Sequence, residues 1–587
     1  MQGNIYRSIY IKDIDKTKVG SFVTVSGWIE NIRDHGGVLF LDLRDNTGKL
    51  QTVSNDDSLF VGLAKESVIR MTGTIRNRST DTINPNLKTG EVELLVDTLE
   101  VLSPSEHELP FQIMFSKDAS EDLRLKYRYL DMRNSNVSNN IKLRSDVLHF
   151  LRNKMYDLGF TEVQTPILSA SSPEGARDFV VPSRNFKGKF YALPQAPQIY
   201  KELLMVGGIE KYFQIAPCFR DEDARADRTL EFYQLDMEMA YVTEEEVLNV
   251  GEDIFYDVFT KFSKKKVSDK PFRRIAYRQA MEDYGTDKPD LRNPLIIKDA
   301  TEVLKDTTFG PFKKSVIKVI VVDDIGDRSN SWFNEVVDYA SSIGMPGIGY
   351  LTLMDDGTFK GPIDKFLSDE ERESLIKDFN MKKNSVMFFI ANKSLKVAQK
   401  FAGLIRDELG KKLDLIDKDR LEFCIIKDFP MFEYDEQNKK YEFCHNPFSL
   451  PHGGIKDYAT HEDIEDILAY QYDFVCNGNE MASGAIRNHD LDSLAKGFEV
   501  VGYTREEIEE RFKSIFTAFK YGCPPHGGMA PGIDRILMLI QDEPNLREVQ
   551  AFPTSASGAD YMMGSPSELT RAQLRELGIK IEVKKDE

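Results

Sequence analysis

The sequence predicts a multidomain protein of mixed α/β and β class: a small N-terminal β-barrel, a large domain built on an antiparallel sheet with helices, and an inserted α+β domain. Three observations predict this organisation. Residues 19–104 hold short strand-like runs split by turn signals, residues 212–241 alternate as a β-hairpin, and residues 291–426 mix strand-like and helical runs. At 587 residues the chain is also too long for one hydrophobic core.

The composition is that of a globular protein. Hydrophobic residues make up 41% and charged residues 29% of the chain, and no apolar run approaches the roughly 20 residues of a membrane-spanning helix. The start of the chain has no apolar signal region and the five cysteines form no CxxC pair, so we expect a cytoplasmic protein with reduced thiols and no zinc. The net charge of -19 argues against a nucleic-acid partner unless a local basic patch or base stacking supplies the contact.

The N-terminal strands are closely spaced and number about five, which fits an OB-fold barrel. Phe40 lies near Arg33 and Gln51 in this region. An aromatic ring with polar neighbours on one strand face suits unpaired nucleic-acid bases. A purely structural barrel is the alternative interpretation, and the pattern alone leaves both open.

The hairpin at residues 212–241 carries the strongest chemical signal. One face of its strands is apolar and the other carries Gln, Asp and Glu in rows, while the loop RDEDARADR places three arginines beside four acids. Phe232 interrupts the polar face, where an aromatic ring can stack on a planar ligand. The residues are consistent with a solvated polar face and equally with a ligand-binding face.

Two strings then carry a family resemblance. FRDEDARADR followed by EFYQLDME resembles motif 2 of class II aminoacyl-tRNA synthetases in its aspartate-specific, bacterial form, and PHGGMAPGIDR, running into ILMLI, resembles motif 3. The N-terminal block is similar to the anticodon-binding domain of aspartyl-tRNA synthetases. By that resemblance Phe40 stacks on an anticodon base, and the other predicted tRNA contacts are Arg33, His35, Gln51 and Glu93. A His at position 35 recurs in relatives that charge both tRNA(Asp) and tRNA(Asn), which predicts relaxed anticodon reading.

The resemblance also predicts domain boundaries. They are 1–104 for the OB-fold, 105–135 for a linker, 136–290 and 427–556 for the two parts of the catalytic domain, 291–426 for a bacterial-type insertion, and 557–587 for a C-terminal extension. The helix and strand that end near Pro166 resemble motif 1, which implies a homodimer through this region. The insertion receives no predicted chemistry.

The same resemblance assigns the substrate sites. The predicted aspartate ligands are Glu174, Gln198, Lys201, Arg220, Asp236, His445 and Arg487. The predicted ATP-binding residues are Arg220, Asp221, Glu222, Thr229, Phe232, Glu480, Gly532, Ile533, Asp534 and Arg535. Glu480 and Asp236 are the predicted Mg²⁺ ligands, with contact to the substrate ammonium as the alternative role of Asp236. Position 196 is a departure, because Ala196 stands where the family usually has Ser.

Three of these residues are expected to be catalytic. Arg220 would neutralise the α-phosphate, Arg535 would bind the γ-phosphate and cover adenine opposite Phe232, and Glu222 would accept from the adenine amino group. Lys201 and Arg487 are expected to select aspartate, since asparagine would leave the two cations uncompensated. Glu480 and Arg487 are an odd number of positions apart in the sequence, so a bulge near Gly484 is needed to bring them to one face.

The sequence therefore predicts an aspartate–tRNA ligase acting on tRNA(Asp), with tRNA(Asn) as a second substrate. The first rival is an ammonia-dependent asparagine synthetase, which shares the catalytic fold but lacks an N-terminal OB domain. The second rival is a non-catalytic tRNA- or single-stranded-DNA-binding protein with a degenerate catalytic domain. The presence of Arg220, Glu222 and Arg535 argues against such decay.

Overall fold

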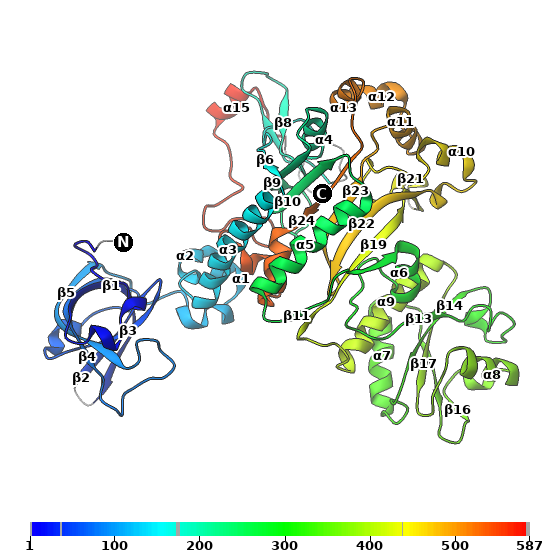
Figure 1. The fold of residues 1–587 in the computed structure, drawn as a ribbon. Coiled ribbons are helices and arrows are strands. Elements are labelled where there is room, and N and C mark those ends of the chain that lie inside the picture. The colour runs from blue at the N-terminus through cyan, green and yellow to red at the C-terminus, as the bar shows by residue number, and fades with distance from the viewer. Residues whose placement is uncertain (1–2, 36–37, 172–175, 437, 583–587) are drawn as a thin grey trace. The chain divides into compact units, whose positions relative to one another are not determined.

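The computed structural model describes residues 3–35, 38–171, 176–436 and 438–582. The chain forms two compact units, one ending at Ala119 and one beginning at Ser120 (Figure 1). Among the described residues, no helix is both long enough and apolar enough to cross a membrane.

The N-terminal unit is a closed five-stranded barrel, as predicted. Its strands are β1 (Phe22–His35), β2 (Val38–Asp45), β3 (Gly48–Ser54), β4 (Val68–Asn77) and β5 (Val92–Ser103). They close in the order β1-β2-β3-β5-β4, with only the β3–β5 pair parallel. Alternate residues of β4 are buried, so each strand contributes one apolar face to a common interior.

The second unit is organised around an eight-stranded sheet in the order β12-β19-β22-β23-β24-β10-β9-β6. Its strands are β6 (Thr161–Glu162), β9 (Lys211–Phe219), β10 (Glu231–Ala240), β12 (Arg273–Ala276), β19 (Phe423–Pro430), β22 (Leu468–Cys476), β23 (Asn479–Ile486) and β24 (His526–Pro531). The pairs at the two ends of the sheet are parallel and the central pairs are antiparallel. The strand expected before Pro166 is shorter than predicted, because only two residues of β6 pair with β9.

Three helices cover one face of this sheet: α3 (Ser135–Asp157), α5 (Glu244–Phe262) and α14 (Ile533–Gln541) (Figure 1). Their apolar sides share one core with Phe213, Leu235, Met237 and Met529 from the strands. The polar residues that alternate with these strand positions therefore point to the opposite face, where the pocket lies.

The segment between motifs 2 and 3 adds a second, five-stranded sheet, which agrees with the predicted α+β insertion. Its strands are β13 (Ile297–Asp299), β14 (Val316–Val322), β15 (Gly349–Leu353), β16 (Phe359–Lys360) and β17 (Val386–Asn392). Its helices are α7 (Asn330–Ser342), α8 (Asp369–Asp378) and α9 (Leu395–Lys412). The core with α7 and α9 lies on one face and the core with α8 on the other. The boundary at residue 426 stays a prediction, and β19 already belongs to the large sheet from Phe423.

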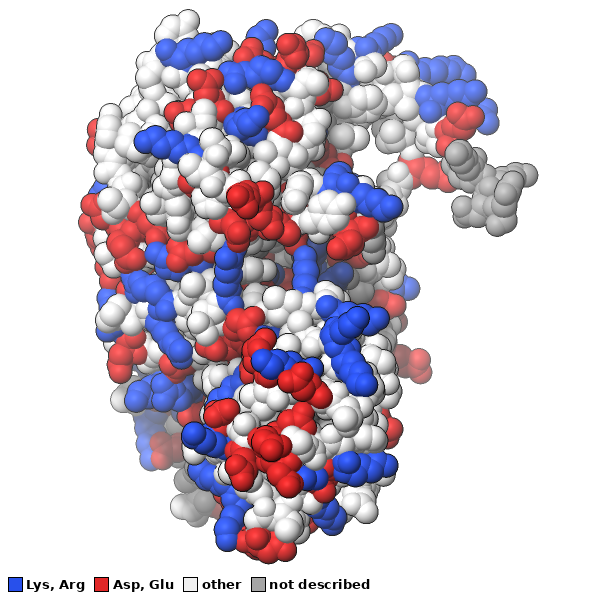
Figure 2. Space-filling view, turned by 90° about the vertical axis from the view of Figure 1, so that its right-hand side faces the viewer, with Lys and Arg blue, Asp and Glu red and all other residues white. Residues whose placement is uncertain are grey.

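The remaining elements connect or flank these layers. The shorter helices are α1 (Glu121–Lys126), α2 (Arg128–Asp131), α4 (Gln198–Val206), α6 (Tyr277–Tyr284), α10 (Asp457–Thr460), α11 (Leu491–Val500), α12 (Arg505–Arg511), α13 (Lys513–Phe519) and α15 (Arg571–Leu577). Three two-stranded ribbons pair β7 (Val180–Pro182) with β8 (Phe190–Ala192), β11 (Lys266–Val267) with β18 (Arg420–Leu421), and β20 (Phe432–Asp435) with β21 (Lys440–Phe443). On the face drawn in Figure 2, the described Lys and Arg side chains are interspersed with Asp and Glu and form no broad basic surface.

Candidate active site

The polar face of the β9–β10 hairpin is not a solvated surface. Asp236 and Glu238 are fully buried, and the strands beneath them form the floor of a pocket of about 540 Å³. The neighbouring strand β24 completes this floor and pairs with β10 through residues 526–529. Because water is excluded here, charged side chains on this face need fixed partners. The ligand-binding interpretation of the hairpin therefore fits the structure better than the solvated one.

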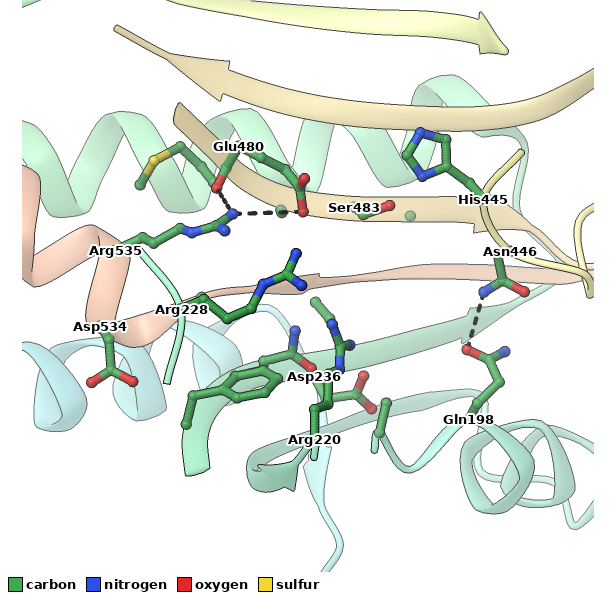
Figure 3. Close-up of a pocket in the computed structure, with 18 of the residues that line it drawn as sticks. Gln198, Arg220, Arg228, Asp236, His445, Asn446, Glu480, Ser483, Asp534 and Arg535 are labelled. Atoms are coloured by element: carbon green, nitrogen blue, oxygen red, sulfur yellow. Dashed lines mark hydrogen bonds and ion pairs between the residues drawn. The ribbon is translucent and has the colours of Figure 1, made fainter. Parts of the chain in front are cut away.

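One end of the pocket gathers the predicted nucleotide residues (Figure 3). The Arg220 guanidinium lies 5.0 Å from the Phe232 ring centroid. Arg535, on the first turn of α14, donates from Nη1 to the Glu480 carbonyl at 2.6 Å, and its Nη1 is 3.7 Å from the Glu480 carboxylate. Arg228 pairs with Glu222 at 2.6 Å. A guanidinium, an aromatic ring and backbone amides from a helix start are suited to a planar base carrying phosphates.

The other end holds the predicted amino-acid cations in a buried network. Lys201 Nζ lies 2.7 Å from Asp236 Oδ1 and 3.4 Å from Glu238 Oε2. The Arg487 fork donates to Glu238 from Nε at 2.8 Å and from Nη2 at 3.1 Å. Lys201 of α4 and Arg487, which follows β23, thus meet at one carboxylate of β10, although β24 separates β10 from β23. All four side chains are at most 3% exposed.

This network corrects the predicted basis of selectivity. The positive charges of Lys201 and Arg487 are already neutralised by Asp236 and Glu238. Burial alone would raise the pKa of Glu238, but Arg487 and Lys201 outweigh it and lower that pKa. For Asp236 burial outweighs Lys201, and the pKa is raised. This end of the pocket therefore offers donors that Glu238 holds in a fixed geometry, and not an unpaired double positive charge.

Gln198 shares the Lys201 side of the pocket and is anchored from both ends. Its Nε2 donates to Glu202 Oε1 at 2.6 Å, and its Oε1 accepts from Asn446 Nδ2 at 3.5 Å (Figure 3). Behind it, the His526 Nε2 lies 3.6 Å from Glu202 Oε2. Burial alone would lower the pKa of His526, but Cys523 and Glu202 outweigh it and raise the pKa to about 10. The sequence prediction did not include Glu202 or Glu238. Glu202 lies one helical turn after Gln198 on α4, and Glu238 lies two positions after Asp236 on β10, so each shares a face with a predicted aspartate-binding residue.

The β22–β23 hairpin supplies Glu480, an acidic residue on one side of the pocket. Asn477 and Gly478 both have positive φ and form its two-residue turn, which pairs Val475 with Glu480. The predicted bulge exists, but its extra residue is Met481 and not Gly484. The bulge lets Glu480 and Arg487 line the same pocket in spite of their odd spacing.

Asp473 of β22 is a buried acid that the sequence prediction did not include among the candidate site residues. It is 1% exposed, and its Oδ2 has no hydrogen-bond partner among the described residues. Burial and then the charge of Glu480 raise its pKa to about 7. Its ligand atom lies within 4.8 Å of those of Asp287 and His445. The Asn-Gly turn signal would have placed Asp473 near Glu480, had the hairpin register been worked out. A buried acid with an unpartnered oxygen beside a second acid fits a hard divalent cation such as Mg²⁺.

Several predicted nucleotide residues take other positions. Asp221 lies beside Arg177, and the Ile533 side chain is fully buried in the core, so only its backbone could reach a ligand. Asp534 pairs with Arg144 of α3 and accepts from the Tyr233 N–H at 3.4 Å, which fixes the start of α14. Thr229, Gly532 and Asp534 all line the pocket. Glu174 lies outside the described residues.

The barrel carries the predicted anticodon residues on one polar network. Arg33 donates to Asp42 at 2.6 Å and to Gln51 at 3.2 Å, and Gln51 donates to Glu93 at 2.8 Å. Phe40 pairs with Arg33 across β1 and β2 and shares a strand face with Asp42. The prediction for His35 concerns a side chain outside the described residues. These strands hold an aromatic ring among fixed donors and acceptors, as recognition of unpaired bases requires.

The fold and this pocket define a class of protein: an antiparallel-sheet nucleotide-binding domain joined to a nucleic-acid-binding barrel. The family model for tRNA synthetases class II (D, K and N) matches residues 120–556, and the model for an OB-fold nucleic acid binding domain matches residues 23–102. The chain belongs to the class II tRNA synthetases of this group.

Named relatives agree with that family. The chain is 48% identical to proteins named aspartate--tRNA(Asp/Asn) ligase from Ehrlichia ruminantium (strain Welgevonden) and from Wolbachia pipientis subsp. Culex pipiens. Each match covers 98% of this chain and 99% or 100% of the relative. The fold resembles an aspartyl tRNA synthetase from Entamoeba histolytica (TM-score 0.56, 19% identity, 93% and 91% of the two chains). It also resembles an asparaginyl-tRNA synthetase from Pyrococcus horikoshii (TM-score 0.57, 19% identity, 94% and 98%). The predicted family is confirmed.

Proposed function

We propose that this protein is an aspartate–tRNA ligase that charges tRNA(Asp) and also tRNA(Asn). The observation that carries the proposal is the joining of two sites in one pocket: an arginine-lined nucleotide end and a slot where Lys201 and Arg487 meet at Glu238. The charging of both tRNAs is supported by the names of the full-length relatives and by the presence of His35.

The chemistry has two steps. The α-carboxylate of aspartate attacks the α-phosphorus of ATP, which forms aspartyl-adenylate and releases pyrophosphate; the terminal ribose hydroxyl of the tRNA then takes the aspartyl group and releases AMP. Arg220 neutralises the charge that develops on the α-phosphate, and Phe232 and Arg535 hold the base between them. Lys201 and Arg487 orient the side-chain carboxylate. Catalysis of this kind rests on positioning and on charge neutralisation rather than on a strong protein base.

Mg²⁺ would be held by Glu480 and Asp473. When bound, it would neutralise phosphate charge. Asp236 was the second predicted metal ligand, but Lys201 donates to its Oδ1 at 2.7 Å at the amino-acid end of the pocket. This position suits the alternative role of Asp236, contact with the substrate ammonium.

Pyrophosphate exchange separates the candidate functions. We expect aspartate-dependent ATP–pyrophosphate exchange without tRNA, followed by aspartylation of both tRNA(Asp) and tRNA(Asn) transcripts. Exchange accompanied by asparagine formation from ammonia, with no tRNA charging, would indicate the asparagine synthetase instead. Binding of tRNA without exchange would indicate the non-catalytic alternative. Charging of tRNA(Asp) alone would refute the relaxed anticodon reading but leave the ligase activity intact.

Phe40→Ala tests the barrel independently of the catalytic pocket. Base stacking on an aromatic ring contributes about 1–3 kcal/mol, so the KM for tRNA should rise roughly 5- to 150-fold. Aspartate-dependent exchange, which needs no tRNA, should stay within twofold. The matched control is Phe22→Ala, at a 62% exposed ring on the same barrel. An unchanged KM for tRNA in Phe40→Ala would rule out stacking at this position.

A homodimer through the motif 1 region is part of the proposal. Ile167 and Leu168 follow Pro166 and are 46% and 55% exposed, and Tyr156 of α3 is 52% exposed. Adjacent exposed apolar side chains are typical of an interface. Ile167→Glu would bury an unpaired charge there, so the dimer dissociation constant should rise at least about 100-fold. Light scattering after size exclusion measures this, with exposed Val61→Glu on the barrel as the control. A dimer that persists in Ile167→Glu contradicts this interface.

A further inference from the structure

A lysine from outside the large sheet reaches the nucleotide end of the pocket. Lys288 lies in the loop that follows α6 and leads into the inserted domain, and its Nζ is 3.0 Å from Glu480 Oε2. It lines the same pocket as Arg220 and Arg535. The sequence prediction placed residue 288 near the end of the first catalytic segment and assigned Lys288 no function.

The charges around Lys288 suggest what it does. Glu480 lies between two cations, with Lys288 at 3.0 Å and Arg535 at 3.7 Å. The Lys288 ammonium is also 3.5 Å from Asp287 Oδ2, so two carboxylates hold it at this position. A triphosphate in the pocket would bring several further negative oxygens to this place. The Lys288 ammonium group beside these oxygens would stabilise the negative charge that develops on the leaving pyrophosphate.

The loop that presents Lys288 is held by the inserted domain. Helix α9 lies beside α6 (Figure 1), and its Arg406 is fully buried below the loop. The Arg406 guanidinium donates to the carbonyls of Asp290 at 3.0 Å, Asn293 at 2.7 Å and Leu295 at 2.6 Å. Asn293 returns a bond from its Nδ2 to the Arg406 carbonyl at 2.8 Å.

Close backbone packing fixes the start of the loop. Gly285 ends α6 with a φ of 70°, and a Cβ at this position would lie 2.2 Å from the Gln399 carbonyl oxygen of α9. Only glycine combines this conformation with such an approach. Together with the bonds of Arg406, this contact leaves the path from α6 to Lys288 little freedom.

We propose that Lys288 is a catalytic residue that binds phosphate oxygens of ATP and of the leaving pyrophosphate, and that α9 of the inserted domain positions it through Arg406. The proposal deepens the ligase function given above and rests on it. It also assigns the insertion a task in the first step: to hold the loop that carries a phosphate-binding cation.

Lys288→Met removes the charge and keeps most of the side-chain length. In exchange assays the KM values for ATP and for pyrophosphate should rise about 10- to 100-fold, while the KM for aspartate stays within twofold. Lys288→Arg should recover most of the loss. The matched control is Lys298→Met, at an exposed lysine ten positions further along the chain. Calorimetry with magnesium pyrophosphate, without aspartate, provides a readout independent of turnover and should show the same loss of affinity.

The outcomes separate the possibilities. If Lys288→Met binds ATP and pyrophosphate as tightly as the wild type, Lys288 makes no phosphate contact and the proposal is overturned. A rise in the KM for aspartate equal to that for ATP indicates a general disturbance of the pocket and overturns it as well. If the wild type itself shows no aspartate-dependent exchange, the ligase function fails instead.

Arg406→Met tests the positioning role. It should raise the KM for pyrophosphate about tenfold in the wild-type background and add nothing in the Lys288→Met background, because both changes remove one interaction. Exposed Lys400→Met on the same helix is the control. Additive effects of Arg406→Met and Lys288→Met would contradict the link through α9, and Lys288→Met tests the phosphate contact even if Arg406→Met fails to fold.

Discussion

Arg487→Leu is expected to lower kcat/KM for aspartate in pyrophosphate exchange by about 10⁴-fold, the size of loss seen when a site built to bind a polar group loses its partner. Glu238 takes the Nε and Nη2 groups of Arg487, which leaves Nη1 as the nitrogen for the proposed contact with the substrate carboxylate. A leucine offers no hydrogen-bond donor, so the side-chain carboxylate of aspartate would enter a buried site without the Arg487 cation to neutralise it. The measurement is steady-state exchange at saturating ATP.

The fold of this variant must be examined with it. Removing Arg487 leaves Glu238 fully buried with only Lys201 as a partner, and breaking such a buried pair costs about 3–5 kcal/mol of stability. The double variant with Glu238→Gln removes the stranded charge and should regain much of this stability without regaining exchange. Normal aspartate-dependent exchange by a folded Arg487→Leu protein would refute its assignment as the aspartate-binding arginine.

Arg220→Met is expected to lower kcat for exchange by about 10³-fold, in the range observed when one preorganised donor to a developing oxyanion is lost. The Arg220 guanidinium lies over the Phe232 ring. Within the part of the chain that the structure describes, it forms no salt bridge with a carboxylate, so its charge is available to a phosphate. ATP binding should weaken much less, because the other pocket cations and the ring remain. Rapid-quench measurement of adenylate formation tests the step directly.

Arg225→Met is the matched control for Arg220→Met. Arg225 lies in the same loop, but its side chain is exposed and only its backbone bridges to Arg228. It should retain exchange within about twofold, as exposed substitutions usually do. Equal losses in the two variants would mean that the loop tolerates no substitution, and near-normal adenylate formation in Arg220→Met would remove Arg220 from the chemistry.

Sequence reasoning succeeded where the information is contiguous. The alternating pattern of residues 212–241 contains both strands, the loop and the residues that face the ligand, so one segment specifies much of the nucleotide end. The barrel strands could also be predicted from the sequence, because a strand such as β4 buries every second residue. The burial of the hairpin's polar face was not readable, since alternation looks the same whether that face meets water or a second wall of protein.

The errors and omissions share one cause. The place of the bulge, at Met481 rather than Gly484, depends on strand pairing in the folded sheet. Asp473 becomes a site residue only when the β22–β23 register is known, and Lys288 only when α9 fixes the loop after α6. None of these relations leaves a local pattern in the chain.

The sequence by itself determined the family, the barrel and the identities of the cations in the pocket, because short strings of residues carry the motifs and their spacing follows strand and helix periods. Only the tertiary structure decided how those cations are compensated. Arg487 reaches Glu238 across β24, which lies between β23 and β10, and Lys201 reaches the same carboxylate from α4. The order of strands in a sheet and the packing of a helix on it depend on long-range contacts that no single segment encodes.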